Sequence, residues 1–150
     1  MWNELPTLTD KIVLGIDPGR DKTGLALVDN HGRVLQAQVV LTGQVAAVLP
    51  GLAKPAAVLV IGNGTTSKEM QQQVRELVPG KQLVVVDETS STEAARPLYW
   101  REHPPKGWRK LMPQGLLVPP VPLDGYAAAI LAQRFLENQA TAIQEQVKKS

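Results

Sequence analysis

The sequence contains no cysteine among its 150 residues. This absence excludes disulfides, thiolate metal sites and cysteine nucleophiles. Histidine is nearly as scarce, since the chain has only His31 and His103, and both fall in stretches whose composition predicts loops. A Ser-His-Asp catalytic set is therefore not available, and carboxylates become the main candidates for any chemistry.

Targeting and membrane-spanning patterns are also missing. Residues 1–4 have neither the basic start nor the apolar core of a signal peptide. The apolar region 39–61 is too broken to span a bilayer, because it contains Gln44, Pro50, Lys54 and Pro55. We therefore expect a cytoplasmic protein that does not enter a membrane. The net charge of +2 and the pI near 9.0 permit a nucleic-acid partner without requiring one.

The pattern of apolar runs and turns predicts a single α/β domain over residues 1–150. Hydrophobic residues make up 43% of the chain, which is enough for a substantial core. We expect strands over residues 12–17, 23–28, 35–41, 56–61 and 83–86, and helices over 44–52, 68–78, from 90 onward and from 122 towards 146. The first three strands form an antiparallel meander and the last two are parallel additions. The result is a mixed five-stranded sheet with helices packed on it.

The first strand carries the most informative motif. Its apolar run ends on Asp17, and Pro18-Gly19 turns the chain immediately afterwards. A carboxylate held at a rigid strand end suits metal or phosphate chemistry. The alternative is an aspartate that only caps its own turn.

Two further acidic positions stand at comparable places. Asp87-Glu88 ends the last predicted strand, and Asp124 lies in the first turn of the last helix. If the first and last strands point the same way, their carboxylates meet at one edge of the sheet and repel each other unless cations lie between them. Mg²⁺ prefers such oxygen ligands together with water and phosphate, and two ions can activate a water and stabilise a leaving oxygen. Metal-assisted phosphodiester hydrolysis is the chemistry that this set predicts.

The stretch after these strands mixes cations with aromatic rings. Ser90 and Glu93 form a capping-box pattern for a helix, which Pro97 either ends early or kinks. Basic groups neutralise phosphates and flat rings stack on unpaired bases, so we predict nucleic-acid contact here. The alternative is a solvated loop whose tryptophans pin it to the core. The predicted contact residues are Arg96, Arg101, Lys106, Trp108, Arg109 and Lys110.

Three motifs resemble one family. Residues 14–19 with Thr23-Gly24 resemble the opening of RuvC-type Holliday junction resolvases and their YqgF (RuvX) relatives. Residues 86–94, which read Val-Asp-Glu-Thr-Ser-Ser-Thr-Glu-Ala, resemble the YqgF signature, and residues 123–136 resemble its final helix. The motifs occur in family order over about residues 11–137.

This resemblance implies an RNase H-like fold, a site that binds Mg²⁺ or Mn²⁺ as two ions, and a role in rRNA-precursor processing or junction cleavage. It implies Asp17, Glu88 and Asp124 as the catalytic and metal-binding residues, and it favours Glu88 over Asp87. Strand alternation places these two neighbours on opposite faces, but hydrophobicity does not choose between them.

The sequence also departs from the family pattern. Where RuvC has an acid after its fourth strand, this chain has Gly62-Asn63-Gly64, and Thr89 and Gly125 replace an arginine and a second acid. A catalytically weak or inactive nucleic-acid-binding module is therefore the alternative to a nuclease. Actin-like ATPases and sugar kinases open with a similar motif, but they need two such domains, which 150 residues do not supply.

Overall fold

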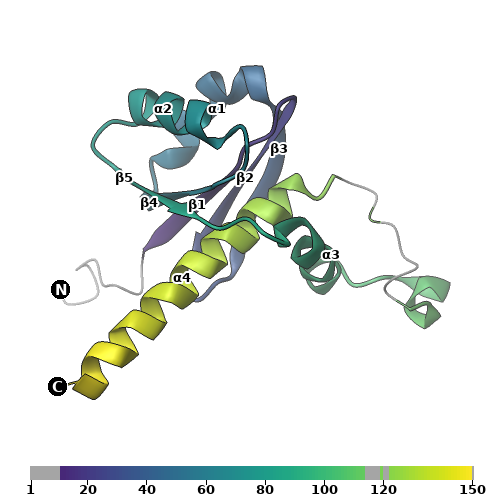
Figure 1. Ribbon diagram of the computed structural model, residues 1–150. Helices are drawn as coiled ribbons and strands as arrows, with labels where there is room; N and C mark the ends of the chain where they lie inside the picture. Colours follow the sequence, from purple (N-terminus) through teal and green to yellow (C-terminus); the bar gives the residue numbers. More distant parts are fainter. Residues whose placement is uncertain (1–10, 114–118, 120–121, 150) are drawn as a thin grey trace, which may run out of the picture.

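A computed structural model describes residues 11–113, 119 and 122–149. Five strands form one sheet with the order β3-β2-β1-β4-β5 (Figure 1). The strands are β1 (Ile12–Asp17), β2 (Lys22–Asp29), β3 (Val34–Leu41), β4 (Ala56–Gly62) and β5 (Gln82–Val86). β1 pairs with β2 and β2 with β3 in antiparallel fashion, whereas β4 pairs in parallel with both β1 and β5. The predicted mixed sheet is confirmed.

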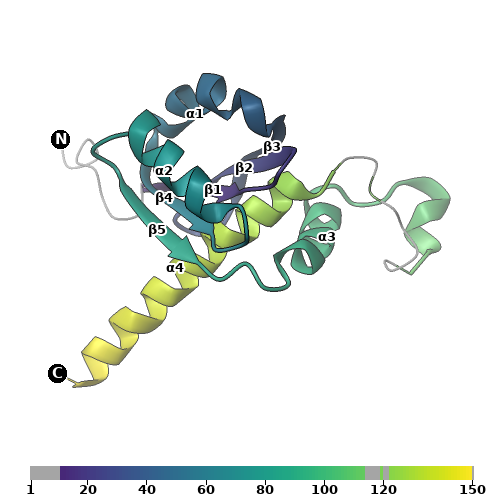
Figure 2. The same ribbon diagram turned by 45° about the horizontal axis from the view of Figure 1, so that its top comes forward.

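Helices cover both faces of this sheet (Figures 1 and 2). They are η3 (Thr42–Gln44), α1 (Val45–Ala53), α2 (Ser67–Leu77), α3 (Ser91–Glu102), η4 (Gly107–Leu111) and α4 (Asp124–Lys149). Side chains alternate along β1, so Leu14 and Ile16 join the core under α1 and α2, while Val13 joins the core under α3 and α4. Burial of β1 on both faces explains its uninterrupted apolar sequence.

Helix α4 lies against the sheet through small residues. Ala127, Ala128, Ala129 and Ala132 are fully buried in this contact. A Cβ atom added to Gly15 would overlap the carbonyl oxygen of Ala128, and one added to Gly24 would overlap the carbonyl oxygen of Asp124. The first turn of α4 is thus held in contact with the beginning of β2, which fixes where Asp124 lies.

Helix α3 differs from its predicted form in two respects. It continues through Pro97, because Leu98, Tyr99 and Trp100 are buried behind it and packing outweighs the lost backbone bond. The predicted capping box is wrong, since Ser90 has a left-handed φ of 61° and its side chain makes no capping hydrogen bond. An N-cap residue that bonds this way normally has extended backbone, so the tight turn after β5 prevents the motif.

None of the helices in the described ranges has the length and apolar character needed to cross a membrane.

Candidate functional site

Three carboxylates from distant parts of the sequence meet at one edge of the sheet. Asp17 ends β1, Glu88 follows β5, and Asp124 is the first residue of α4. Burial, as the largest cause, and the negative charges of Glu88 and Asp124 together raise the pKa of Asp17 to about 7. The structure therefore brings the three predicted acids into electrostatic contact, in a partly desolvated place that holds excess negative charge.

Glu88 lies over the glycine loop that follows β4. Its Oε2 atom is buried and has no hydrogen-bond partner. A Cβ atom on Gly62 would come within 2.5 Å of this oxygen, and one on Gly64 would overlap Oε1 of the same carboxylate. Gly62 and Gly64 thus leave the space that the Glu88 carboxylate fills. A buried carboxylate oxygen without a donor is costly, and a cation would relieve that cost.

Asn63 lies in the loop between β4 and α2. Its Oδ1 accepts a hydrogen bond from the backbone N–H of Glu88 at 3.2 Å. Asn63 therefore positions the Glu88 backbone and adds no charge.

Asp87 has a different role from its neighbour. Its Oδ1 accepts hydrogen bonds from the Thr89 backbone N–H at 3.0 Å and from the Thr89 hydroxyl at 2.7 Å. These bonds lower the pKa of Asp87, whose side chain is exposed. Its carbonyl oxygen accepts from Arg134 of α4 at 2.9 Å. Asp87 thus stabilises the turn before α3, although its donors come from Thr89 and not from the helix itself.

Threonine hydroxyls secure the turn that follows Asp17. Thr66 donates to the carbonyl oxygen of Pro18 at 3.2 Å, and Thr42 donates to that of Gly19 at 2.8 Å. The hydroxyls of Thr23 and Thr42 are also 2.9 Å apart. These links to β2, η3 and the loop after β4 restrict the Asp17 turn, and sequence reasoning missed them because they join residues far apart in the chain.

The donor set has the chemistry of a site for a hard divalent cation, since it consists of carboxylate oxygens. The raised pKa of Asp17 and the unpartnered Oε2 of Glu88 both indicate that positive charge would be favourable here. Over the described ranges, however, no three Asp, Glu or His side chains lie close enough together to hold a metal ion. The residues fit a cation in type and charge, but the carboxylates would have to draw together around it.

The basic aromatic stretch divides into a buried part and an outer part. Tyr99 and Trp100 are 6% and 5% exposed and pack beside α4. These two rings therefore attach the segment to the core and are not available to stack on bases. Trp108 is 68% exposed and lies in η4, which stands away from the sheet in both views (Figures 1 and 2). Of the predicted cations, Arg96, Arg101, Lys106 and Lys110 are exposed, and Arg109 lies in η4.

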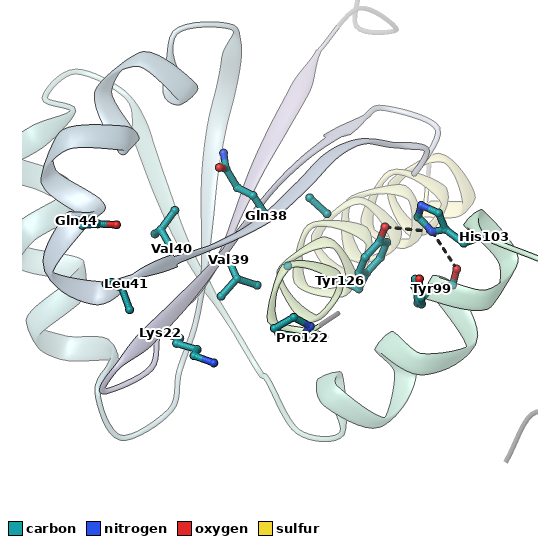
Figure 3. Close-up of a pocket in the computed structure, with 12 residues that line it drawn as sticks. Lys22, Gln38, Val39, Val40, Leu41, Gln44, Tyr99, His103, Pro122 and Tyr126 are labelled. Carbon is teal, nitrogen blue, oxygen red and sulfur yellow. Dashed lines mark hydrogen bonds between the residues drawn. The ribbon is translucent and has the colours of Figure 1, made fainter. Parts of the chain in front are cut away.

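A pocket of about 600 Å³ opens between β3, the end of α3 and the start of α4 (Figure 3). Its wall includes Gln38 and Leu41 from β3, His103 after α3 and Tyr126 from α4. Gly125, the neighbour of Asp124, also lines it. No sequence pattern indicates this pocket, because its walls come from segments that lie far apart in the chain.

The two neighbouring acids of the β5 turn are expected to respond differently to removal of charge. Glu88→Gln keeps the shape of a side chain whose Oε2 is buried and removes charge near Asp17. Its melting temperature should therefore equal or exceed that of the wild type, while Mn²⁺ affinity falls. Asp87→Asn weakens the bonds to Thr89, so it should melt earlier and retain Mn²⁺ affinity. Thermal melts and calorimetric Mn²⁺ titrations on both variants check this, and the reverse pattern would show that Asp87 is the ligand.

A family model for the Tex protein YqgF-like domain matches residues 11–106. No curated protein sequence matches the chain.

Among solved structures, the chain is similar to Thermus thermophilus RuvC in complex with a Holliday junction substrate, with 17% identity and a TM-score of 0.54 over 87% of this chain and 97% of RuvC. A second T. thermophilus RuvC structure gives 16% identity and a TM-score of 0.47 over 80% and 91% of the two chains. A putative sugar kinase from Cytophaga hutchinsonii gives 13% identity and a TM-score of 0.42 over 57% of this chain, which spans 38% of the kinase's length. The likeness to junction-bound RuvC confirms the RNase H-like fold.

Proposed function

The chain belongs to the Tex protein YqgF-like domain family, and on that premise we propose that it is a divalent-metal-dependent nuclease for structured nucleic acid. The observation that carries the proposal is the convergence of Asp17, Glu88 and Asp124, which come from the three family-like motifs. Burial of Asp17 and the charges of Glu88 and Asp124 raise the pKa of Asp17. Structured RNA, such as an rRNA precursor, and branched DNA in the cytoplasm are the candidate substrates.

In this proposal Asp17, Glu88 and Asp124 hold Mg²⁺ or Mn²⁺. When bound, such ions supply a water of lowered pKa and stabilise the leaving oxygen of a phosphodiester. Asp17 has to lose its proton to take part, which the cation's charge favours. The Thr42 and Thr66 hydroxyls keep the Asp17 turn in place, and Asn63 holds the Glu88 backbone. The chain's own contribution is to hold in place the backbone that carries two of these acceptors.

Nucleic-acid binding is supported by two independent features. The RuvC structure with which this fold agrees contains a Holliday junction substrate. Exposed cations before and within η4 lie near the exposed ring of Trp108 in the sequence. The cations can neutralise nucleic-acid phosphates, and the ring can stack on an unpaired base.

Removal of three cations should weaken binding in a salt-dependent way. For Arg101, Lys106 and Lys110 changed together to Ala, we expect lower affinity and a slope of log K against log salt that is shallower by about 2, because fewer counterions are released. Fluorescence anisotropy at several salt concentrations measures this. A matched variant with Lys68→Ala and Arg75→Ala, on exposed positions of α2, should keep the wild-type slope. Equal slopes in all three proteins would show that the stretch does not contact nucleic acid.

Cleavage itself tests the proposed function. Purified protein is incubated with Mn²⁺ and labelled rRNA-precursor fragments, single strands and four-way junctions, with EDTA and Glu88→Gln as controls. We expect cleavage of at least one substrate that both controls abolish. Binding without cleavage on every substrate would overturn the nuclease proposal and favour a non-catalytic binding module.

A further inference from the structure

The pocket beside α4 lies next to the candidate catalytic edge. Gly125 lines the pocket and directly follows Asp124, and Gly24 of β2 packs against the carbonyl oxygen of Asp124. Lys22, which begins β2 after the Asp17 turn, lines the same pocket (Figure 3). A nucleic-acid strand with a phosphate at the Asp17, Glu88 and Asp124 carboxylates would therefore pass the mouth of this pocket.

One wall of the pocket is a braced aromatic ring. Tyr126 is partly exposed, with its ring centroid 5.4 Å from that of Tyr99 and 6.0 Å from that of His103. Its hydroxyl lies 3.4 Å from Nδ1 of His103, as Figure 3 shows. The buried Tyr99 supports the ring from behind, so Tyr126 offers a flat face without needing to be ordered by a ligand.

The other walls combine one apolar surface with a few polar groups. Leu41 of the edge strand is 55% exposed and gives the wall an apolar surface. The Lys22 ammonium carries a positive charge. An apolar pocket with few polar groups is the usual form of a small-ligand site.

We propose that this pocket receives an unpaired nucleobase of the strand bound at the carboxylates. The base stacks on Tyr126, while Lys22 neutralises the adjoining phosphate. A base within a duplex cannot leave its stack without a cost in free energy, so the site selects single-stranded or branched nucleic acid over intact duplex. The inference rests on the proposed function for the path of the strand, but it concerns binding and not cleavage.

The first test uses the wild-type protein in EDTA, so that no cleavage is required. A labelled oligothymidylate should bind about 10-fold more tightly than an abasic strand of equal length and charge, which corresponds to one base stacked on an aromatic ring. Tyr126→Phe keeps the ring and should keep this preference, whereas Tyr126→Ala should reduce it by about 10-fold. Thermal melts establish that both variants are folded.

The second test locates the base and needs no variant. Oligonucleotides carrying 5-iodouracil are crosslinked by light to the wild-type protein, and the modified peptide is mapped. Crosslinks to Tyr126 or His103 support the pocket. Crosslinks confined to Trp108, or equal binding of abasic and base-bearing strands, would overturn it. Loss of cleavage with the base preference intact would contradict the nuclease proposal alone.

Discussion

Asp17→Asn is expected to abolish metal-dependent cleavage and to make the folded protein more stable at neutral pH. Asparagine cannot replace the charge that the cation requires. It does remove a carboxyl whose burial and whose neighbours Glu88 and Asp124 disfavour ionisation. Because that side chain is only partly buried, we expect a gain of about 1–3 kcal/mol in the free energy of unfolding above pH 7.

The gain should depend on pH in a defined direction. The pKa of Asp17 is about 7 in the folded protein against 3.8 ordinarily, so the folded state holds the extra proton between these values. The free energy of unfolding of the wild type should therefore fall as the pH rises from about 4 towards 7. The asparagine variant has no carboxyl at this position, so its free energy of unfolding should not show this fall. Denaturant unfolding of both proteins at pH 4, 5.5, 7 and 8 measures it. A difference that is constant with pH, or largest at pH 4, would contradict the assignment.

Gly24→Ala is expected to cause the largest loss of stability of any single methyl addition near the site. The new Cβ would overlap the carbonyl oxygen of Asp124, which is backbone at the first turn of α4 and cannot rotate away. Either α4 or β2 must move, at a cost of about 3 kcal/mol or more. We expect a fall in melting temperature of roughly 10 °C and lower Mn²⁺ affinity, since Asp124 moves with its helix.

A second glycine provides the control for this variant. Gly51 lies inside α1, and a Cβ there meets nothing within 4 Å. Gly51→Ala should therefore stabilise the protein by about 0.5–1 kcal/mol through helix propensity. If Gly24→Ala were as stable as Gly51→Ala, the close packing of α4 on the sheet would be wrong.

The sheet could be predicted because its strands differ in burial. Apolar runs over β1 and β4 indicate strands covered on both faces, and the alternation over β3 indicates a half-exposed antiparallel strand. On the face of β3 that the alternation makes apolar, Leu35 and Leu41 are nevertheless 49% and 55% exposed. The turn residues Pro18 and Gly19 then place Asp17 at a strand end. These signals are local in sequence, which is why they suffice.

Features that depend on tertiary contacts could not be predicted in this way. The turn at Ser90 takes a left-handed conformation that defeats its capping pattern. Tyr99 and Trp100 read as part of an exposed basic stretch, but α3 turns them towards α4. The space for the Glu88 carboxylate depends on the end of β4 and the loop after it meeting the loop after β5.

The direct test of the account is a calorimetric titration of Mn²⁺ into the wild type and Asp17→Asn at pH 8 and pH 6. Because the cation must displace the proton that Asp17 holds around pH 7, wild-type affinity should be about 10-fold weaker at pH 6, and binding should release protons to the buffer. Asp17→Asn should bind weakly and equally at both values. Tight Mn²⁺ binding by Asp17→Asn, or no binding by the wild type at pH 8, would contradict a metal site at these three carboxylates.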